Sequence, residues 1–249
     1  MGTTVCQAVA DDPGLELTVA VDPFHAGLDL RQVTGIDLPL QMAAGPEAML
    51  DAGVDVAVDF TQIDAARDNM VWLADAGIHA VVGTSGFGQP DVAHFTELFT
   101  KSNCVIAPNF AIGAVLMMRF AELAAPYFET AEIIELHHDQ KIDAPSGTAM
   151  ATAQRMAAAS ADWAPDPTTE HVAEGARGGR GAGDIPVHSV RLRGIVAHQE
   201  VLLGTTGQTL TIRHDSYDRS SFMPGVVLAV KKIGDRPGLT FGLDALLDI

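Results

Sequence analysis

The sequence predicts an α/β protein of two domains, a doubly wound parallel sheet followed by a second α+β domain that carries an open mixed sheet. Two observations support this prediction. Between residues 3 and 107, short apolar stretches alternate with helix-forming stretches, as strands and crossover helices do in a parallel sheet. Between residues 187 and 213 the residues instead alternate between apolar and polar, and a Gly-rich turn separates the last two stretches.

The first domain is expected to alternate helices with strands. Polar or Gly-rich residues follow each strand, and ligands of such sheets bind outside the carboxyl ends of the strands. The expected helices are residues 3–10, 46–52, 65–76 and 91–100, and the expected strands are residues 15–21, 54–60, 79–82 and 104–107. The strand ends are Asp22, Asp59-Phe60-Thr61, Gly83 to Gly86 and Ala107 to Phe110.

The second domain is expected to comprise residues 112–220, and the first domain residues 1–111 and 221–249. Its expected elements are a helix over 113–128, a strand over 132–137, a helix over 146–160, a long loop over 161–184, strands over 187–193, 197–203 and 209–213, and a hairpin turn at 204–208. A helix over 222–233 and the tail 239–249 are expected to return to the first domain.

Composition and charge exclude several classes of function. The chain has 249 residues, of which 47% are hydrophobic, as in an ordinary soluble α/β protein. A formal charge of −17 argues against duplex binding, which needs a basic surface for the phosphates. Cys6 and Cys104 give neither a disulfide framework nor a metal-binding spacing, so we expect no metal site. Without a basic leader or an apolar stretch of 18 residues, we expect a cytoplasmic protein that does not bind membranes.

The stretch Glu135 to Gly147 is the most informative part of the chain. It places His137, His138 and Lys141 just before a helix that Ser146 or Thr148 can cap. Imidazole, ammonium and the free N–H groups of a helix N-terminus together suit an anionic substrate that must also receive a proton. Two adjacent histidines can also be merely solvated, so the pair by itself does not establish a catalytic site.

Five motifs in one order resemble those of the dihydrodipicolinate reductase family over nearly the whole chain. They are Val58 to Thr61, Gly83 to Phe87, Ala107 to Phe110, Glu135 to Thr148 and Arg213 to Ser216. The resemblance implies a Rossmann-like first domain. It also implies NAD(P)H-dependent reduction of a small dicarboxylate, 4-hydroxy-tetrahydrodipicolinate, to tetrahydrodipicolinate in the diaminopimelate route to lysine. A homotetramer built through the sheets of the second domain is implied as well.

The resemblance also implies the roles of the site residues. His137 is the expected acid/base residue, and Lys141 is the expected second proton donor. His138 is expected to bind one substrate carboxylate, while Gly147 and Thr148 hold the other through the helix N-terminus. We interpret Asp143 as a turn residue rather than as a partner that orients Lys141. Solvated or intersubunit strand positions are expected for most of a further group, namely His188, His198, His214, Arg191, Arg193 and Arg213.

Two loops and one carboxylate are the expected cofactor contacts. By resemblance, Gly83, Thr84 and Ser85 contact the nicotinamide nucleotide, and Ser85 stands where the family more often has Thr. A second loop is expected beside the nicotinamide and comprises Ala107, Pro108, Asn109 and Phe110. The carboxylate of Asp22 is expected to accept hydrogen bonds from ribose hydroxyls. Because no Arg or Lys follows Asp22 before Arg31, we expect NADH to be preferred and NADPH to be accepted.

One element of the family is missing from this sequence. The family begins with a strand and a G-x-x-G-x-x-G turn, whereas this chain opens at Met1-Gly2, which resembles the end of that turn. We therefore expect the first strand to be missing from the sheet, and we favour a misassigned start codon as the reason. Two alternatives to the reductase remain at this point, a truncated non-catalytic subunit and a dehydrogenase of another imino or oxo dicarboxylate.

Overall fold

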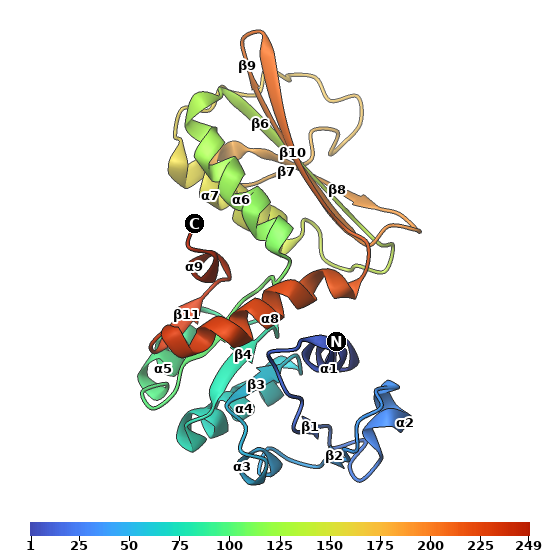
Figure 1. The fold of residues 1–249 in the computed structure, drawn as a ribbon. Coiled ribbons are helices and arrows are strands. Elements are labelled where there is room, and N and C mark those ends of the chain that lie inside the picture. Colours follow the sequence, from blue (N-terminus) through green and yellow to red (C-terminus); the bar gives the residue numbers. More distant parts are fainter. The chain divides into compact units, whose positions relative to one another are not determined.

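The computed structural model describes residues 1–249 and consists of two compact units (Figure 1). One unit comprises Met1–Phe110 and Arg219–Ile249, and the other comprises Ala111–Asp218. The predicted domains differ from these units at residues 111, 219 and 220 only. No helix of the chain is both long and apolar enough to cross a membrane.

The first unit contains a four-stranded parallel sheet with the order β11-β5-β4-β3. Its strands are β3 (Val56–Asp59), β4 (His79–Val82), β5 (Cys104–Ile106) and β11 (Leu239–Phe241). Strand β5 is buried throughout and β4 almost so, as expected for strands that helices cover on both faces. The parallel sheet predicted from the apolar runs is thus confirmed, and so is the return of the C-terminal tail to this unit.

The helices that connect these strands begin and end at residues with clear local signals. Helix α4 (Ile63–Ala76) ends at Gly77, whose φ of 73° is left-handed and therefore suits Gly. Helix α5 (Gln89–Leu98) has Pro90 in its first turn, where no backbone N–H is needed. The C-terminal residues 219–249 of this unit add the helices α8 (Met223–Lys232) and α9 (Asp244–Leu247) and the 3₁₀ turns η3 (Arg219–Phe222) and η4 (Ile233–Asp235).

The first 55 residues depart most from the prediction. Helix α1 (Gly2–Asp11) is confirmed, but of the expected strand 15–21 only β1 (Ala20–Val21) forms, and it pairs in parallel with β2 (Met42–Ala43) alone. The expected helix 46–52 is reduced to α3 (Ala48–Asp51), and α2 (Leu30–Thr34) was not expected. Strands β1 and β3 each pair on one side only, so the two sheets of this unit are not joined by any strand, in keeping with the expected missing first strand.

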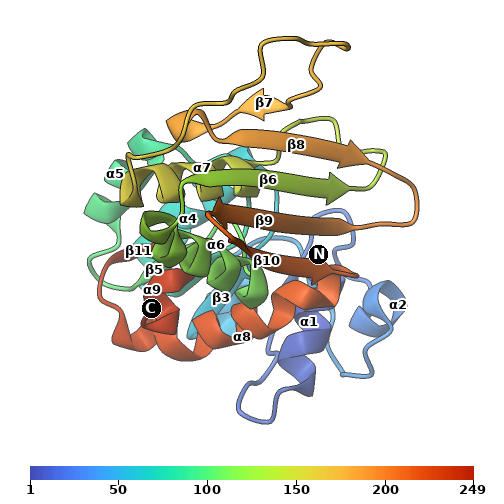
Figure 2. The same ribbon diagram turned by 90° about the horizontal axis from the view of Figure 1, so that it is seen from above.

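The second unit contains a five-stranded mixed sheet with the order β10-β9-β6-β8-β7 (Figure 2). Strand β6 is parallel to β8, and the other pairs are antiparallel. The strands are β6 (Thr130–His137), β7 (Gly179–Arg180), β8 (Pro186–Arg191), β9 (Ala197–Thr205) and β10 (Gln208–Ser216). The turn between β9 and β10 is confirmed and contains Gly207 with a φ of 77°.

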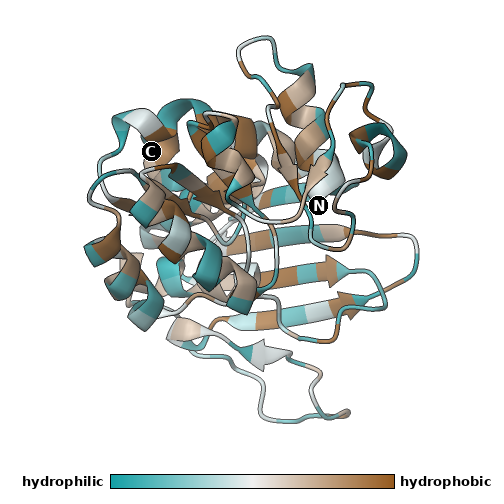
Figure 3. Ribbon diagram, turned by 90° about the horizontal axis from the view of Figure 1, so that it is seen from below, coloured by the Kyte–Doolittle hydropathy of each residue, from teal (hydrophilic) through white to brown (hydrophobic).

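Two helices of the second unit lie on one face of this sheet, and none of its helices lies on the other face (Figures 1 and 2). They are α6 (Ile112–Ala124), which the 3₁₀ turn η1 (Ala125–Tyr127) extends, and α7 (Gly147–Ala159). Along β6, alternate residues are buried, and α7 packs against this strand. Figure 3 shows hydrophobic and hydrophilic residues alternating along these strands. The expected loop 161–184 contains only β7 and the 3₁₀ turn η2 (Ala182–Asp184).

Candidate active site

Strand β6, the loop that follows it and the start of α7 carry the predicted catalytic residues. His137 is the last residue of β6, Lys141 lies in the loop, and Gly147 is the first residue of α7. The cap of this helix is Ser146, whose side chain accepts a hydrogen bond from the backbone N–H of Ala149 at 3.2 Å. The loop thus joins a strand end to a capped helix start, where free N–H groups favour an anion.

A buried carboxylate, that of Glu135, holds this arrangement together. Glu135 has 0% exposure and accepts two hydrogen bonds from the guanidinium of Arg191, each 2.9 Å long. The carboxylate of Glu135 also contacts Nδ1 of His137 at 2.5 Å and the backbone N–H of Ser146 at 3.2 Å, and Ser189 gives it a further hydrogen bond. The register explains the cluster, because His137 pairs with Arg191 and Glu135 pairs with Ser189 between the parallel strands β6 and β8. All four side chains therefore emerge on one face of the sheet.

The charges in this cluster set the protonation of both partners. Burial by itself would raise the pKa of Glu135, but the hydrogen bonds from Arg191, Ser189 and His137 outweigh it, so the pKa is lowered and the carboxylate stays ionised. The pKa of His137 is also lowered, mainly by burial, while the adjacent Glu135 opposes that change. The imidazole of His137 is therefore neutral at pH 7 in the free site.

The ammonium group of Lys141 is held by Asp143 rather than free in solvent. Its Nζ donates to both carboxylate oxygens of Asp143, at 2.7 and 2.8 Å. This ion pair lowers the pKa of Asp143. The interpretation of Asp143 as only a turn residue was therefore wrong, because its side chain makes the contact that the sequence analysis set aside. Any anion that binds Lys141 must compete with Asp143.

The predicted substrate-binding residues lie at the two ends of the same loop. The ring of His138 is exposed, and its backbone N–H donates to the carbonyl oxygen of Val196 at 3.3 Å. A Cβ added at Gly147 would meet no atom within 4 Å, so the space in front of the helix start is open. Thr148 follows and is half-buried. A convergence of His138 with the helix N-terminus on one ligand remains a prediction.

Arg191 belongs to the candidate site but was not predicted from the sequence as one of its residues. It was grouped with solvated or intersubunit positions, but it is the partner of a carboxylate 56 residues away in the chain. Strand pairing of this kind is not visible in a single sequence. Several others of that group also find partners within the chain. His188 contacts Glu132, His198 contacts Asp215, Arg193 contacts Asp139, and Arg213 contacts both Glu200 and Asp215.

In the first unit, the two predicted cofactor loops leave the same edge of the parallel sheet. Val82 of β4 is paired with Ile106 of β5, so the loops that begin at Gly83 and Ala107 start side by side. A larger residue at position 83 would displace the ring of Phe60, because a Cβ there would lie 2.2 Å from that ring. That ring also packs against Phe110, with 5.7 Å between the ring centroids.

Within these loops the side chains differ in what they offer to a ligand. The hydroxyl of Thr84 is buried and donates to Asp59 at 3.1 Å, so its side chain is used inside the protein. Ser85 and Pro108 are exposed, Asn109 is half-buried, and Ala107 is fully buried. Ser85 is thus the residue of the first loop with an exposed hydroxyl, while Ala107 serves the packing of the sheet.

Asp22 follows β1 in the separate two-stranded sheet. Its carboxylate accepts a hydrogen bond from the backbone N–H of Phe24 and contacts Nδ1 of His25, both at 2.9 Å. The contact with His25 is the main reason that the pKa of Asp22 is lowered. With 37% of its side chain exposed, the carboxylate is ionised and accessible to a hydroxyl ligand.

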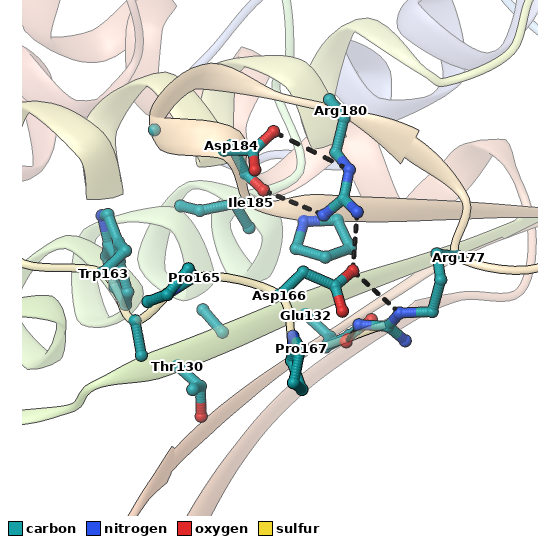
Figure 4. Close-up of a pocket in the computed structure, with 14 residues that line it drawn as sticks. Thr130, Glu132, Trp163, Pro165, Asp166, Pro167, Arg177, Arg180, Asp184 and Ile185 are labelled. Carbon is teal, nitrogen blue, oxygen red and sulfur yellow. Dashed lines mark hydrogen bonds and ion pairs between the residues drawn. The ribbon is translucent and has the colours of Figure 1, made fainter. Parts of the chain in front are cut away.

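A pocket of about 320 Å³ lies elsewhere in the second unit, and none of the predicted site residues lines it (Figure 4). Its two arginines are both neutralised. Arg177 contacts Asp166 and Glu132, and Arg180 contacts Asp166 and Asp184. Both arginines of the pocket are therefore already paired with carboxylates.

Two family models together match almost the whole chain. The N-terminal part of dihydrodipicolinate reductase matches residues 1–110, and the C-terminal part matches residues 113–247. The chain belongs to the dihydrodipicolinate reductase family. The C-terminal match includes the whole Glu135 to Thr148 segment, and the N-terminal match includes both cofactor loops. The resemblance stated from the five motifs is thereby confirmed.

Similar proteins in this reductase family include several from mycobacteria. The 4-hydroxy-tetrahydrodipicolinate reductase of Mycobacterium sp. (strain KMS) is 53% identical over 92% of this chain and 93% of its own length. The one from Mycobacterium marinum is 49% identical over 100% and 95%. A solved structure, dipicolinate-bound dihydrodipicolinate reductase from Paenisporosarcina sp. TG-14, is 39% identical, with a TM-score of 0.85 and coverage of 98% and 94%. The predicted fold class is confirmed by this likeness.

Proposed function

We propose that the chain reduces 4-hydroxy-tetrahydrodipicolinate to tetrahydrodipicolinate with NAD(P)H, in the diaminopimelate route to lysine. The observation that carries the proposal is the buried Glu135–His137 pair beside a capped helix start, within a segment that matches the reductase family. Relatives similar over more than 90% of both chains bear the reductase name, which favours this activity over the two alternatives weighed from the sequence.

In this proposal the residues of the second unit bind the dicarboxylate and deliver a proton. The N–H groups at Gly147 and Thr148 hold one carboxylate, because the start of α7 is the positive end of its dipole. Lys141 exchanges Asp143 for a substrate oxygen, and His138 binds the other carboxylate. The 4-hydroxyl leaves as water before or during reduction. His137, once it has taken up a proton to form the imidazolium, donates the proton that the reduced ring requires, with Lys141 as the second donor.

The first unit is the Rossmann-like domain that binds the nicotinamide nucleotide, which supplies the hydride. We assign the contacts to Asp22, to Gly83, Thr84 and Ser85, and to the loop of Ala107, Pro108, Asn109 and Phe110. The shared sheet edge, the exposed hydroxyl of Ser85 and the accessible carboxylate of Asp22 fit such a ligand. NADH is the expected preference with NADPH accepted, since Arg31 is 69% exposed and pairs with Asp37.

We also propose a cytoplasmic homotetramer. The sheet face of the second unit that lies opposite α6 and α7 carries no helix of that unit, and we propose that other copies of the chain bind there (Figure 1). Sedimentation analysis of the purified protein tests this, and a monomer at micromolar concentration would contradict it.

A steady-state assay with 4-hydroxy-tetrahydrodipicolinate and each cofactor tests the proposed reaction. We expect turnover with both cofactors and competition by dipicolinate. Calorimetric titration with NADH then separates the alternatives. NADH binding without turnover would indicate a dehydrogenase of another dicarboxylate, whereas no NADH binding would indicate a non-catalytic subunit.

A further inference from the structure

We infer that Glu135 is a positioning residue for His137, holding the imidazole in the tautomer that carries its proton on Nδ1, with Arg191 as the counter-charge of the buried carboxylate. The inference rests on the proposed function, in which His137 exchanges a proton with the substrate. It assigns positioning roles to two residues, Glu135 and Arg191, that act through His137.

The tautomer follows from the chemistry of the contact. Oε2 of Glu135 lies 2.5 Å from Nδ1 of His137, and an ionised carboxylate can only accept hydrogen bonds. Nδ1 of the neutral ring must therefore be the donor. The lone pair is then on Nε2, so a proton enters and leaves the ring there. In the other tautomer the two lone pairs would face each other across 2.5 Å, which is strongly repulsive.

The carboxylate can impose this orientation because it is itself immobile. Arg191 binds it with two parallel hydrogen bonds of 2.9 Å, the geometry in which a guanidinium best recognises a carboxylate. The backbone N–H of Ser146 fixes the same oxygen that Nη2 of Arg191 contacts. Neither oxygen is free to rotate away, so the plane of the His137 ring is set by groups on β8 and α7 as well as on its own strand.

The same contact sets the pH at which His137 takes up a proton. The charged groups that act on this ring are Glu135 on its own strand, Arg191 on β8 and Lys141 in the loop, the last paired with Asp143. Glu135 alone favours the imidazolium, whereas burial, Lys141 and Arg191 oppose it and lower the pKa. Removing the negative charge of Glu135 therefore makes the imidazolium of His137 still less stable.

Glu135→Gln is the decisive variant, and Glu132→Gln is its matched control. Glu132 lies on the same strand and contacts Nε2 of His188 at the same distance of 2.5 Å, but on the other face of the sheet. Histidines labelled with ¹⁵N report both the tautomer and the titration of each ring by NMR. In the wild type we expect a proton on Nδ1 of neutral His137. In Glu135→Gln we expect a mixture of tautomers and a titration midpoint lower by about one pH unit, the effect of losing one charge-assisted hydrogen bond.

The pH dependence of kcat/KM is a second, independent test. In Glu135→Gln the alkaline limb of the kcat/KM profile should move to lower pH by the same amount as the NMR midpoint, and in Glu132→Gln it should stay in place. An unchanged tautomer and midpoint in Glu135→Gln would overturn the inference. If that variant does not fold, the wild-type spectrum decides, because a neutral His137 protonated on Nε2 excludes the assigned role.

The two hypotheses fail in different ways. A fully active His137→Gln variant would remove His137 from the proposed reaction, yet the NMR result would still show whether Glu135 sets its tautomer. The opposite result is an inactive His137→Gln variant together with an unchanged tautomer and midpoint of His137 in Glu135→Gln. It would support the proposed reaction and reject the positioning role of Glu135.

Discussion

Strand β6 carries two clusters of the same composition, one on each face of its sheet. Glu135 contacts His137 and Arg191 on the face that packs against α7, and Glu132 contacts His188 and Arg177 on the other face. The two glutamate–histidine contacts have the same length of 2.5 Å. The glutamate side chain is 0% exposed in the first cluster and 31% exposed in the second. Contact geometry alone therefore does not distinguish a candidate catalytic pair from a surface pair.

Burial and position make the difference between them. An exposed ion pair contributes about 0–1 kcal/mol because water screens it, whereas breaking a buried pair leaves an uncompensated charge and costs about 3–5 kcal/mol. The buried cluster also lies at the end of β6, directly before a loop with a lysine and a helix start. The half-buried cluster of Glu132 borders a pocket whose arginines are already paired with carboxylates (Figure 4). The matched residues of the two clusters allow direct tests.

The largest expected difference is in kcat, between variants of the two histidines. His137→Gln should lower kcat by roughly 10²–10⁴-fold, the usual contribution of a general acid, with little effect on NADH affinity. His188→Gln should retain near wild-type kcat, because its ring contacts Glu132 in the half-buried cluster, away from the predicted site residues. Turnover at saturating NADH measures both. Equal losses in the two variants would mean that the clusters do not differ in function.

Replacing each of the two arginines should reduce the free energy of unfolding by different amounts. Arg191→Ala leaves the buried Glu135 without its counter-charge and should reduce the free energy of unfolding by about 3–5 kcal/mol. Arg177→Ala breaks a partly exposed pair and should cost about 1 kcal/mol or less. Urea titrations followed by circular dichroism give both values, and a similar small loss in both would show that Glu135 is readily hydrated.

Removal of the loop ammonium should affect ligand binding. Lys141→Ala should weaken dipicolinate binding by about 1.5–3 kcal/mol, the contribution of a charge-assisted hydrogen bond. Asp143→Asn should instead strengthen it, because the competing carboxylate at 2.7 Å is gone. Lys101→Ala in the first unit is the control for net charge. An unchanged Kd in Lys141→Ala, measured by calorimetry, contradicts the assigned role.

The smallest expected effect is a change in the stability deficit of Glu135→Gln at acidic pH. Because the folded-state pKa of Glu135 is lowered, its contribution to stability is present above its unfolded pKa of about 4.3 and is lost as pH falls through the folded value. The stability deficit of Glu135→Gln relative to the wild type should therefore be constant near pH 7 and shrink below about pH 4. Denaturant midpoints across this range test it, and a deficit that grows on acidification would reverse the sign of the pKa shift.

Elements with strong local signals were predictable, and elements defined by partners were not. The apolar runs of β4 and β5 and the capped helix α7 lie within a few residues of the expected ranges. Residues 15–21 were predicted to form a strand from their apolar residues. A strand also needs a neighbour, and β1 pairs only with the two residues of β2. A local pattern cannot report the neighbour on which the pairing depends.

The same limit applies to the candidate site. His137 and Lys141 were identified from one short stretch of sequence and a resemblance. Arg191 was missed because its relation to Glu135 depends on the register between β6 and β8. The alternation of Val187, Ser189 and Arg191 on one face was visible in the sequence, but which residues of another strand lie opposite that face was not.

The contact between Glu135 and the backbone of Ser146 also restricts how this segment can evolve. The carboxylate of Glu135 accepts a hydrogen bond from the backbone of Ser146, eleven residues later, at the other end of the loop. Arg191 holds the loop at a second point, because it donates to the carbonyl oxygen of Asp143 at 2.6 Å. These contacts therefore constrain the number of residues between the two anchors. Ile142 is fully exposed and should accept many replacements, whereas inserting or deleting a single residue beside it would move Lys141 or detach the helix cap.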